Sequence, residues 1–354
     1  MERESTNKGD DMVRSNRITI KDVAKKAGVS PSTVSRVISG SQRISEETTI
    51  HVNKCMEEMG YFPNAIARSL ANKYTNTIGL IMPNKPGEAL LNPFFPQAIS
   101  GIIKGATIYG YDVLISSHLD GDDEIKSISS LVNASKVDGI LLMTSRLEDK
   151  SIEYLTKVGF PFAVIGSPSD KYQFNYVDND NVSASYELTT YLINEGYKSF
   201  ALIAGDETLT VTNHRIKGYL KALEDGKIPL SNSSLYSGDF NERTGHYFGN
   251  LLGEEGKLPE AIIVTDDVVA YGLASAFSEN GIRVPGDVAI ASFNNSLLSR
   301  QCHIPLTSVE INADMLGEEA TKILINSIKN DDDYKKVTVP YKIHIRESTM
   351  RTLL

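Results

Sequence analysis

From Thr77 onward, short apolar runs alternate with amphipathic stretches of helical length. The apolar runs are TIGLIMP, YDVLISS, DGILLMT, PFAVIGS, SFALIAG, AIIVTDD and VAIASFN, and two of the amphipathic stretches are FPQAISGIIKGATIYG and VSASYELTTYLINEG. This α/β alternation predicts parallel sheets covered by helices on both faces. The strands suit two doubly wound lobes with a cleft between them, and ligands of such sheets bind at the carboxyl ends of the strands.

Two short helices with clear boundary signals are predicted near the N-terminus. Thr19 and Asp22 fit a capping box, in which a carboxylate follows a capping hydroxyl by three residues, and Gly28 ends that helix. Ser30 can cap the second helix, and the proline after it suits the first helical position. The second helix is PSTVSRVIS, which Gly40 ends.

A third helix begins after Ser45, where Glu46 and Glu47 favour the positive end of the helix dipole, and it ends at Gly60. Two helices joined by a turn of about four residues and backed by a third form a helix-turn-helix unit, whose second helix enters the major groove of DNA. The alternative is a solvated helix on an all-α scaffold, where the outward residues would have no special role.

The outward face of the second helix carries short hydroxyls and one arginine. Hydroxyls suit phosphates and base edges, and Arg36 can donate two parallel hydrogen bonds to O6 and N7 of guanine. The predicted DNA contacts in these first helices, caps included, are Thr19, Ser30, Ser32, Thr33, Ser35 and Arg36.

Charge is distributed unevenly along the chain, whose net charge is −9. Residues 17–75 carry nine Lys and Arg against five Asp and Glu, a net charge of +4, whereas residues 76–354 carry 24 against 36, a net charge of −12. A basic segment on an acidic body can attract phosphates at one end and repel them at the other. The charge pattern therefore supports double-stranded DNA as a partner of the N-terminal segment.

Several other classes of protein are excluded by the sequence. No apolar run approaches the roughly 20 residues that span a bilayer, and the first residues are polar, so we expect a cytoplasmic protein without a membrane partner. The two cysteines, Cys55 and Cys302, lie outside any metal-binding spacing, so we expect no disulfide, metal or cofactor. Nucleotide-binding, metalloprotease and hydrolase motifs are absent, so we expect no enzyme. His214 is expected to lie beside the cleft or to be structural, and not to be catalytic, and the acidic run 331–333 is expected to be a solvated loop.

Four segments resemble the LacI/GalR family of bacterial repressors, and the resemblance continues to about Arg346. They are ITIKDVAKKAGVSPSTVSRVISG, ISEET, MGYFPNAIARSLANK and NTIGLIMP. The resemblance implies a three-helix head, a hinge helix, and two lobes of the periplasmic-binding-protein type joined by three chain crossings. The expected domains are a disordered extension 1–17, a helix-turn-helix domain 18–63, a hinge helix or linker 64–76, and an effector-binding and dimerisation core 77–347. Within this core, the expected lobes are about 77–177 with 306–330, and about 178–305 with 331–347.

The segment Asn64–Lys73 gains a role only from this resemblance, because alone it is too short to hold a helix in water. In the family this stretch folds on the operator, pairs with its dimer mate and wedges a leucine into the minor groove, and Leu70 is the matching position. Such a wedge costs unstacking energy but bends the duplex toward the protein. Arg68 would contact the DNA backbone. We therefore expect a homodimer on a pseudo-palindromic operator, because one head makes too few contacts for selective binding.

Polar and aromatic residues at strand ends are candidates for the cleft, and the polar ones among them fall on effector positions of the family. Arg215, Asp266 and Asn294 would supply the paired donors and acceptors that sugar hydroxyls require. Flat apolar faces for a sugar ring are offered by Phe94, Phe95, Phe240 and Phe293. Each residue has a structural alternative: a phenylalanine can belong to the core, Asp266 can cap a helix, and Asn294 can stand in a turn.

One position departs from several sugar-responsive members, which place an aspartate after the fourth strand. Here Gly166 stands in that place and Ser167, a further effector candidate, follows it. The missing carboxylate argues against a close copy of galactoside recognition. The phrases NPFFP, VIGSP, YVDNDN, SFNNSLLS and PLTSVEIN resemble the maltose-operon repressors of Gram-positive bacteria. This resemblance implies a repressor of maltose or maltodextrin genes that a sugar inducer releases from its operator.

Three alternatives are left open. A regulator of the same family could use a different sugar, or a corepressor such as a purine or a phosphorylated carrier protein, and bind DNA more tightly with it. A pure solute-binding protein is opposed by the head. An enzyme of sugar metabolism would turn over maltose, which we predict this protein does not do.

Overall fold

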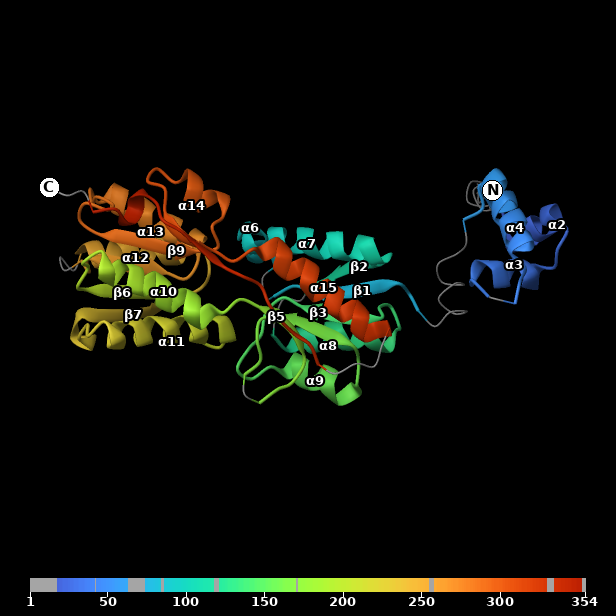
Figure 1. Cartoon of the computed structure of the whole chain (residues 1–354), viewed down its shortest axis with the longest axis horizontal. Helices are drawn as coiled ribbons and strands as arrows, with labels where there is room; N and C mark the ends of the chain where they lie inside the picture. Colours follow the sequence, from blue (N-terminus) through green and yellow to red (C-terminus); the bar gives the residue numbers. More distant parts are fainter. Residues whose placement is uncertain are drawn as a thin grey trace, which may run out of the picture. The chain divides into compact units, whose positions relative to one another are not determined.

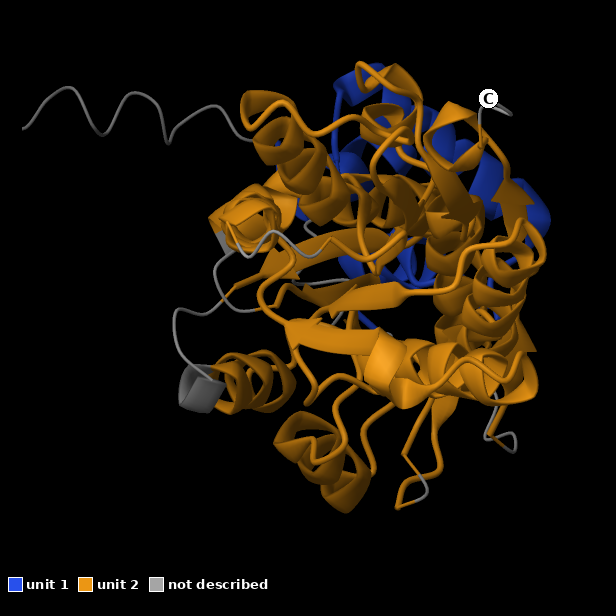
Figure 2. Ribbon diagram, turned by 90° about the vertical axis from the view of Figure 1, so that its left-hand side faces the viewer, with its two compact units in different colours: residues 1–76 blue, residues 77–354 orange. Residues whose placement is uncertain are grey.

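The computed structural model describes residues 18–41, 43–62, 74–83, 86–117, 121–169, 171–254, 258–329 and 334–351. The chain divides into two compact units, residues 1–76 and 77–354 (Figure 2). The expected extension 1–17, most of the expected hinge helix with Arg68 and Leu70, and the acidic run 331–333 lie outside the described residues. Across the described part of the chain, every helix is too short or too polar to pass through a bilayer.

Unit 1 is a bundle of three helices around a small apolar core. The helices are α2 (Ile20–Ala27), α3 (Pro31–Ile38) and α4 (Glu46–Met59). The core contains one fully buried valine from each helix: Val23, Val34 and Val52. Ser30 and Ser45 cap α3 and α4 as predicted, because each side chain accepts a hydrogen bond from the backbone N–H three residues later. The three-helix head is therefore confirmed.

The first lobe of unit 2 is built on one six-stranded parallel sheet, in the order β11-β5-β4-β3-β1-β2. Its strands are β1 (Thr77–Ile81), β2 (Asp112–Ser116), β3 (Gly139–Leu142), β4 (Phe162–Ile165), β5 (Asn175–Asp178) and β11 (Lys336–Thr338). Its helices are α6 (Pro86–Leu91), α7 (Phe94–Tyr109), α8 (Gly121–Asn133), α9 (Lys150–Val158) and α15 (Ala313–Lys329). Helices α7 and α15 cover one face, and α8 and α9 the other (Figure 1).

The second lobe is built on a six-stranded sheet in the order β12-β10-β9-β8-β6-β7, in which only β12 is antiparallel to its neighbour. Its strands are β6 (Phe200–Ala204), β7 (Ser233–Ser237), β8 (Ala261–Val264), β9 (Ala289–Phe293), β10 (Thr307–Glu310) and β12 (Lys342–His344). Its helices are α10 (Asn181–Asn194), α11 (Thr210–Asp225), α12 (Glu242–Glu254), α13 (Asp267–Glu279) and α14 (Leu297–Gln301), with short 3-10 turns at Leu230–Asn232 and Glu347–Thr349. Two doubly wound lobes are thus confirmed.

The sheet pairings show that two strands belong to the other lobe than expected. β10 pairs with β9 in the second sheet, although it was expected in the first lobe, and β11 pairs with β5 in the first sheet, although it was expected in the second. The chain completes the second sheet with β10 before it returns as α15 and β11, and it crosses a last time to β12. The three expected crossings therefore lie between β5 and α10, between β10 and α15, and between β11 and β12.

Glycines set the close approach of the paired helices. A Cβ atom added at Gly101 of α7 would overlap the carbonyl oxygen of Asp314, and one added at Gly317 of α15 would overlap that of Ala98. Helices α12 and α13 meet in the same reciprocal way, through Gly245 of one and Gly272 of the other. Backbones this close leave no room for a methyl group, so each pair depends on glycine for its packing.

We expect Gly101→Ala to destabilise unit 2 by about 1–3 kcal/mol, because the added methyl group must push α7 away from α15. Gly87→Ala is the matched control, since a Cβ atom there meets nothing within 4 Å. That substitution is expected to leave stability unchanged or slightly improved. Urea denaturation of both variants measures the difference, and equal midpoints would show that the α7–α15 contact tolerates a methyl group.

Candidate functional site

The outward face of α3 presents the predicted DNA-contacting side chains. Ser32, Ser35 and Arg36 are exposed, on the side of the helix opposite the buried Val34 and Val37. The capping hydroxyl of Ser30 lies 2.7 Å from the Ser32 hydroxyl and 2.9 Å from the Thr33 hydroxyl. The N-terminal end of α3 therefore gathers three hydroxyls, and the arginine stands one turn further along.

Thr19 is engaged at the start of α2. Its backbone N–H and its hydroxyl both donate to the Asp22 carboxylate, at 2.8 and 2.6 Å. These bonds hold the pKa of the Asp22 carboxyl below its usual value. The first turn of α2 is thereby stabilised, and a DNA contact from Thr19 remains a prediction.

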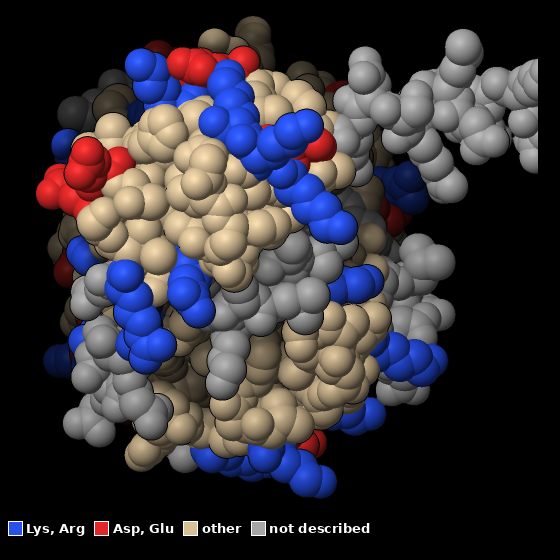
Figure 3. Space-filling model, turned by 90° about the vertical axis from the view of Figure 1, so that its right-hand side faces the viewer, with Lys and Arg blue, Asp and Glu red and all other residues tan. Residues whose placement is uncertain are grey.

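The described part of unit 1 exposes cations on all three helices and on the turn after α3. They are Lys21, Lys25, Lys26, Arg36, Arg43 and Lys54. Lys26 also bonds to Glu58 at 2.7 Å. In the view of Figure 3, Lys and Arg side chains predominate over acidic ones on the face toward the reader. Exposed cations of this kind supply the non-specific part of an attraction to phosphates.

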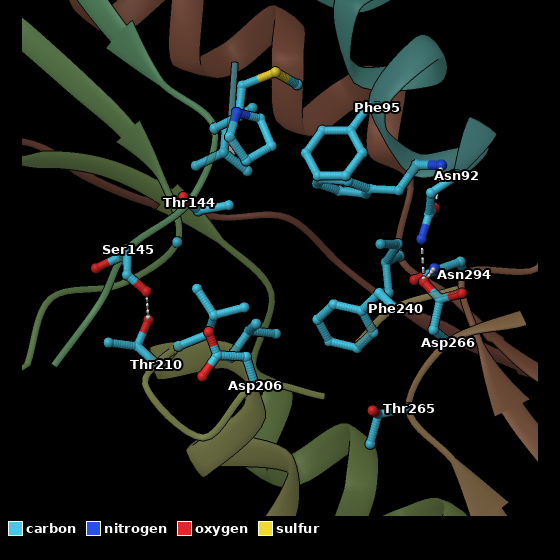
Figure 4. Close-up of a pocket in the computed structure, with 18 of the residues that line it drawn as sticks. Asn92, Phe95, Thr144, Ser145, Asp206, Thr210, Phe240, Thr265, Asp266 and Asn294 are labelled. Carbon is cyan, nitrogen blue, oxygen red and sulfur yellow. Dashed lines mark hydrogen bonds between the residues drawn. The ribbon is translucent and has the colours of Figure 1, made fainter. Parts of the chain in front are cut away.

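A cavity of about 370 Å³ lies in unit 2, between the two lobes. Its wall is formed by residues that follow the carboxyl ends of strands in both sheets, as the sequence predicted. They include Thr144 and Ser145 after β3, Asp206 after β6, Thr265 and Asp266 after β8, and Asn294 after β9 (Figure 4). Phe94 and Phe95 line the cavity from the first lobe, and Phe240 from the second.

Asp266 is the centre of the polar wall. Its carboxylate accepts hydrogen bonds from Val268 N at 2.7 Å, Asn294 Nδ2 at 2.9 Å and Asn92 Nδ2 at 2.8 Å. Burial raises the pKa of this carboxyl to about 6. Asp266 thus caps α13 and also lines the cavity, so its structural role does not exclude effector binding, which remains a prediction. Asn294 likewise stands in a turn, with φ 102°, and lines the cavity.

Arg215 lines the cavity, and its guanidinium donates two hydrogen bonds to the protein. Its Nε donates to Asn181 Oδ1 at 2.9 Å and its NH1 to the carbonyl oxygen of Thr265 at 2.6 Å. The group stacks 4.2 Å from the centre of the Phe293 ring, and burial lowers its pKa to about 10. Phe293 is itself fully buried, so it supports Arg215 and is not among the residues that line the cavity.

Ser167 does not reach the cavity wall described here, which Gly166 lines instead. The Ser167 N–H and hydroxyl donate to the Asp178 carboxylate at 2.9 and 2.8 Å. Its hydroxyl also lies 3.3 Å from Nδ1 of His214. Because the serine proton goes to the carboxylate and not to the histidine, these three residues are not arranged as a nucleophilic triad.

The lobes touch at two edges of the cavity. At one edge, Asn92 of the first lobe donates to Asp266 of the second. At the other, the Leu147 N–H donates to the carbonyl oxygen of Thr208 at 2.9 Å, and the Thr210 N–H to that of Ser145 at 3.0 Å. Asn92 was not predicted from the sequence, although it stands in the motif NPFFP, because nothing local marks an asparagine as a contact between lobes.

Two family models match the chain. That of "Bacterial regulatory proteins, lacI family" matches residues 19–64, and that of "Periplasmic binding protein-like domain" matches residues 189–349. The regulator MalR of Streptococcus pneumoniae is 36% identical over 90% of this chain and 95% of its own length, and the repressor PurR of Actinobacillus pleuropneumoniae is 33% identical over 91% and 95%. A solved complex of the regulator CelR with cellobiose is 26% identical, with a TM-score of 0.72 over 94% of this chain and 100% of that one.

Proposed function

We propose that this protein, which belongs to the lacI family of bacterial regulatory proteins, represses maltose or maltodextrin genes and is released from its operator by a sugar. Membership of the family makes the chain a DNA-binding transcription regulator and not an enzyme. As such it would act in the cytoplasm, where the bacterial chromosome lies. We further propose that it binds as a homodimer, with one α3 helix in each half of a pseudo-palindromic operator.

The observation that carries the sugar proposal is the composition of the cavity wall. A carboxylate and two amides stand at one end, at Asp266, Asn92 and Asn294, and aromatic rings reach in from both lobes (Figure 4). Carboxylates and amides suit vicinal hydroxyls, and aromatic faces suit the apolar face of a sugar ring. A similar solved structure, described as a probable maltose operon transcriptional repressor and 28% identical to this chain with a TM-score of 0.73, supports maltose in particular.

The charge of the wall favours an uncharged effector. The acidic residues of the wall are Glu88, Asp178, Asp206, Asp239 and Asp266, whereas its cations are Arg146 and Arg215. Arg215 is bound to the protein as described above, and Arg146 lies 3.7 Å from Glu124. A phosphate group would therefore face a wall with more acidic side chains than cations, which disfavours its binding.

We expect maltose or maltotriose to raise the melting temperature of the protein and to weaken its binding to operator DNA. A ligand that binds only the folded state stabilises it by mass action, so the screen detects an effector directly. Glucose 6-phosphate is expected to produce no shift, because of the acidic wall. If no neutral sugar shifts the melting temperature, the sugar proposal fails.

The alternative is a corepressor such as a purine, which the resemblance to the family leaves open. Hypoxanthine and guanine therefore belong in the same thermal screen. The sign of the effect on the operator separates the two functions, because an inducer weakens operator binding and a corepressor tightens it.

We expect Arg36→Ala to cost about 1–3 kcal/mol of operator binding and to relax the choice of base at one position of each half-site. Lys54→Ala, which removes an exposed cation from α4, is the control and should leave the base preference unchanged. Selection of binding sites from random DNA measures both variants. Unchanged discrimination in the Arg36 variant would mean that another side chain reads that base.

A further inference from the structure

Asn92 and Asp266 form a buried hydrogen bond between the two lobes. The amide lies just before α7 in the first lobe, the carboxylate lies at the start of α13 in the second, and 174 residues separate them. Asn92 is 3% exposed and Asp266 is 4% exposed. A buried polar pair of this kind is held by its own hydrogen bonds, because water does not compete for them.

Both the oxygen and the nitrogen of the Asn92 side-chain amide are hydrogen-bonded, so the NH2 group can face only the carboxylate. Its Oδ1 accepts from the N–H of Phe94 at 3.0 Å, in the first turn of α7, while Nδ2 donates to Asp266. A flipped amide would set its oxygen against a carboxylate and its NH2 group against an N–H group. The start of α7, which carries Phe94 and Phe95, is thereby attached to Asp266.

Asp266 has few acceptor sites left for a ligand. A carboxylate has about four lone-pair sites. Oδ2 receives Asn92 and Asn294, and Oδ1 receives the backbone of Val268. The remaining site on Oδ1 is open to a hydroxyl of the effector only while the other three bonds hold the carboxylate in this orientation.

We propose that Asn92 is a positioning residue for the effector: by bonding to Asp266 across the cleft, it orients that carboxylate and makes sugar binding depend on closure of the lobes. The inference rests on the proposed function, in which Asp266 accepts a sugar hydroxyl. A ligand that needs the closed arrangement binds it with higher affinity than the open one, and so shifts the balance between them.

The electrostatics of the site agree with this role. Burial raises the pKa of Asp266, and the adjacent Asp267 raises it further. The Asn92 hydrogen bond, the Val268 N–H and the Arg215 guanidinium act in the opposite direction, and Asn92 is the strongest of the three. Loss of the Asn92 hydrogen bond from the buried site would therefore leave a carboxyl that is protonated more readily and accepts hydroxyl protons less well.

Two variants of the full chain separate this role from a merely structural one. Asn92→Ser keeps an oxygen that can cap α7 but shortens the side chain, so the donor to Asp266 is lost. Asn294→Gly removes a donor to the same oxygen from within the second lobe, and glycine suits the backbone there, where φ is 102°. The control thus loses the same kind of bond without a contact between lobes.

Both variants are expected to weaken maltose binding about tenfold, because each loses a hydrogen bond to a charged group. Both should also raise the pH midpoint, which is the pH at the middle of the fall in maltose affinity. Only Asn92→Ser is expected to speed hydrogen exchange at Leu147 and Thr210, whose N–H groups donate across the other edge of the cavity. Calorimetry over a pH series and hydrogen exchange of the sugar-free protein measure these effects.

Three results would overturn the inference: tighter maltose binding by Asn92→Ser, an unchanged pH midpoint, or hydrogen exchange that matches that of Asn294→Gly. If wild-type protein binds no sugar, the proposed function fails instead. The exchange comparison in sugar-free protein still decides in that case whether Asn92 holds the lobes together.

Discussion

Asp267→Ala is expected to destabilise unit 2 by roughly 3–5 kcal/mol, because it leaves buried donors without an acceptor. The Asp267 carboxylate accepts from the hydroxyls of Ser292 and Ser308, at 2.5 and 2.9 Å, and from the N–H of Ser296 at 2.6 Å. All four residues are buried, and together they connect the ends of β8, β9 and β10 to the start of α13. Thermal unfolding measures the loss, with a fall in Tm of about 10 °C expected for a unit of this size.

Asp287→Ala is the matched control, because it removes an exposed carboxylate with the same number of hydrogen bonds as the buried one. The Asp287 carboxylate also accepts three hydrogen bonds, all from Arg283, through its backbone N–H, its Nε and its NH2. This group lies at the surface, where water replaces a lost partner, so little change in Tm is expected. A similar loss in both variants would show that the number of bonds, and not their burial, decides the cost.

The local signals of the sequence predicted the elements because each signal acts within a few residues. The caps at Ser30 and Ser45 lie where the helices begin, and Gly28 and Gly60 adopt the left-handed backbone that ends them. The apolar runs became strands, and all except YDVLISS are buried, since a strand covered on both faces needs apolar residues throughout. YDVLISS forms β2, which lies at the edge of its sheet and is partly exposed. Fold class and head could therefore be predicted from periodicity, capping and family resemblance.

The exchange of β10 and β11 between lobes could not be predicted in this way. β11 has three residues, and its partner Tyr176 precedes it by 160 positions. No local pattern distinguishes the two sheets, because both accept short strands of similar composition. Sheet membership depends on long-range pairing, which a local pattern does not specify.

The cavity was predicted in its general position and only partly in its residues. Asp266, Asn294 and Phe240 line it because they follow the carboxyl ends of β8, β9 and β7, and Phe94 lines it from the start of α7. Ser167 bonds to Asp178, and the residue before it, Gly166, lines the cavity. The prediction for Ser167 was therefore wrong by one position. Asn92 was missed since its partner is distant in the chain, and its role depends on the closed arrangement of the lobes.

Asp266→Asn is expected to weaken sugar binding about tenfold to a hundredfold for each hydroxyl that the carboxylate accepts, and so to leave the operator occupied in the presence of sugar. An asparagine supplies one acceptor oxygen where the carboxylate supplies two, and its NH2 group would face the Val268 N–H or the two amides. Wild-type affinity is expected to fall as the pH is lowered through about 6, because protonation near this pKa removes the ionised acceptor. In the variant that pH dependence should disappear.

Asp206→Asn is the control for charge, since Asp206 also lines the cavity but is exposed and bonds to the backbone of Thr208, before the start of α11. It removes one negative charge from the same wall without disturbing Asp266, so only a small loss of sugar affinity is expected. Calorimetry at pH 5 and pH 8 and operator release by maltose measure both variants. An Asp266 variant that still releases the operator at wild-type sugar concentrations would assign effector recognition to other residues of the cleft.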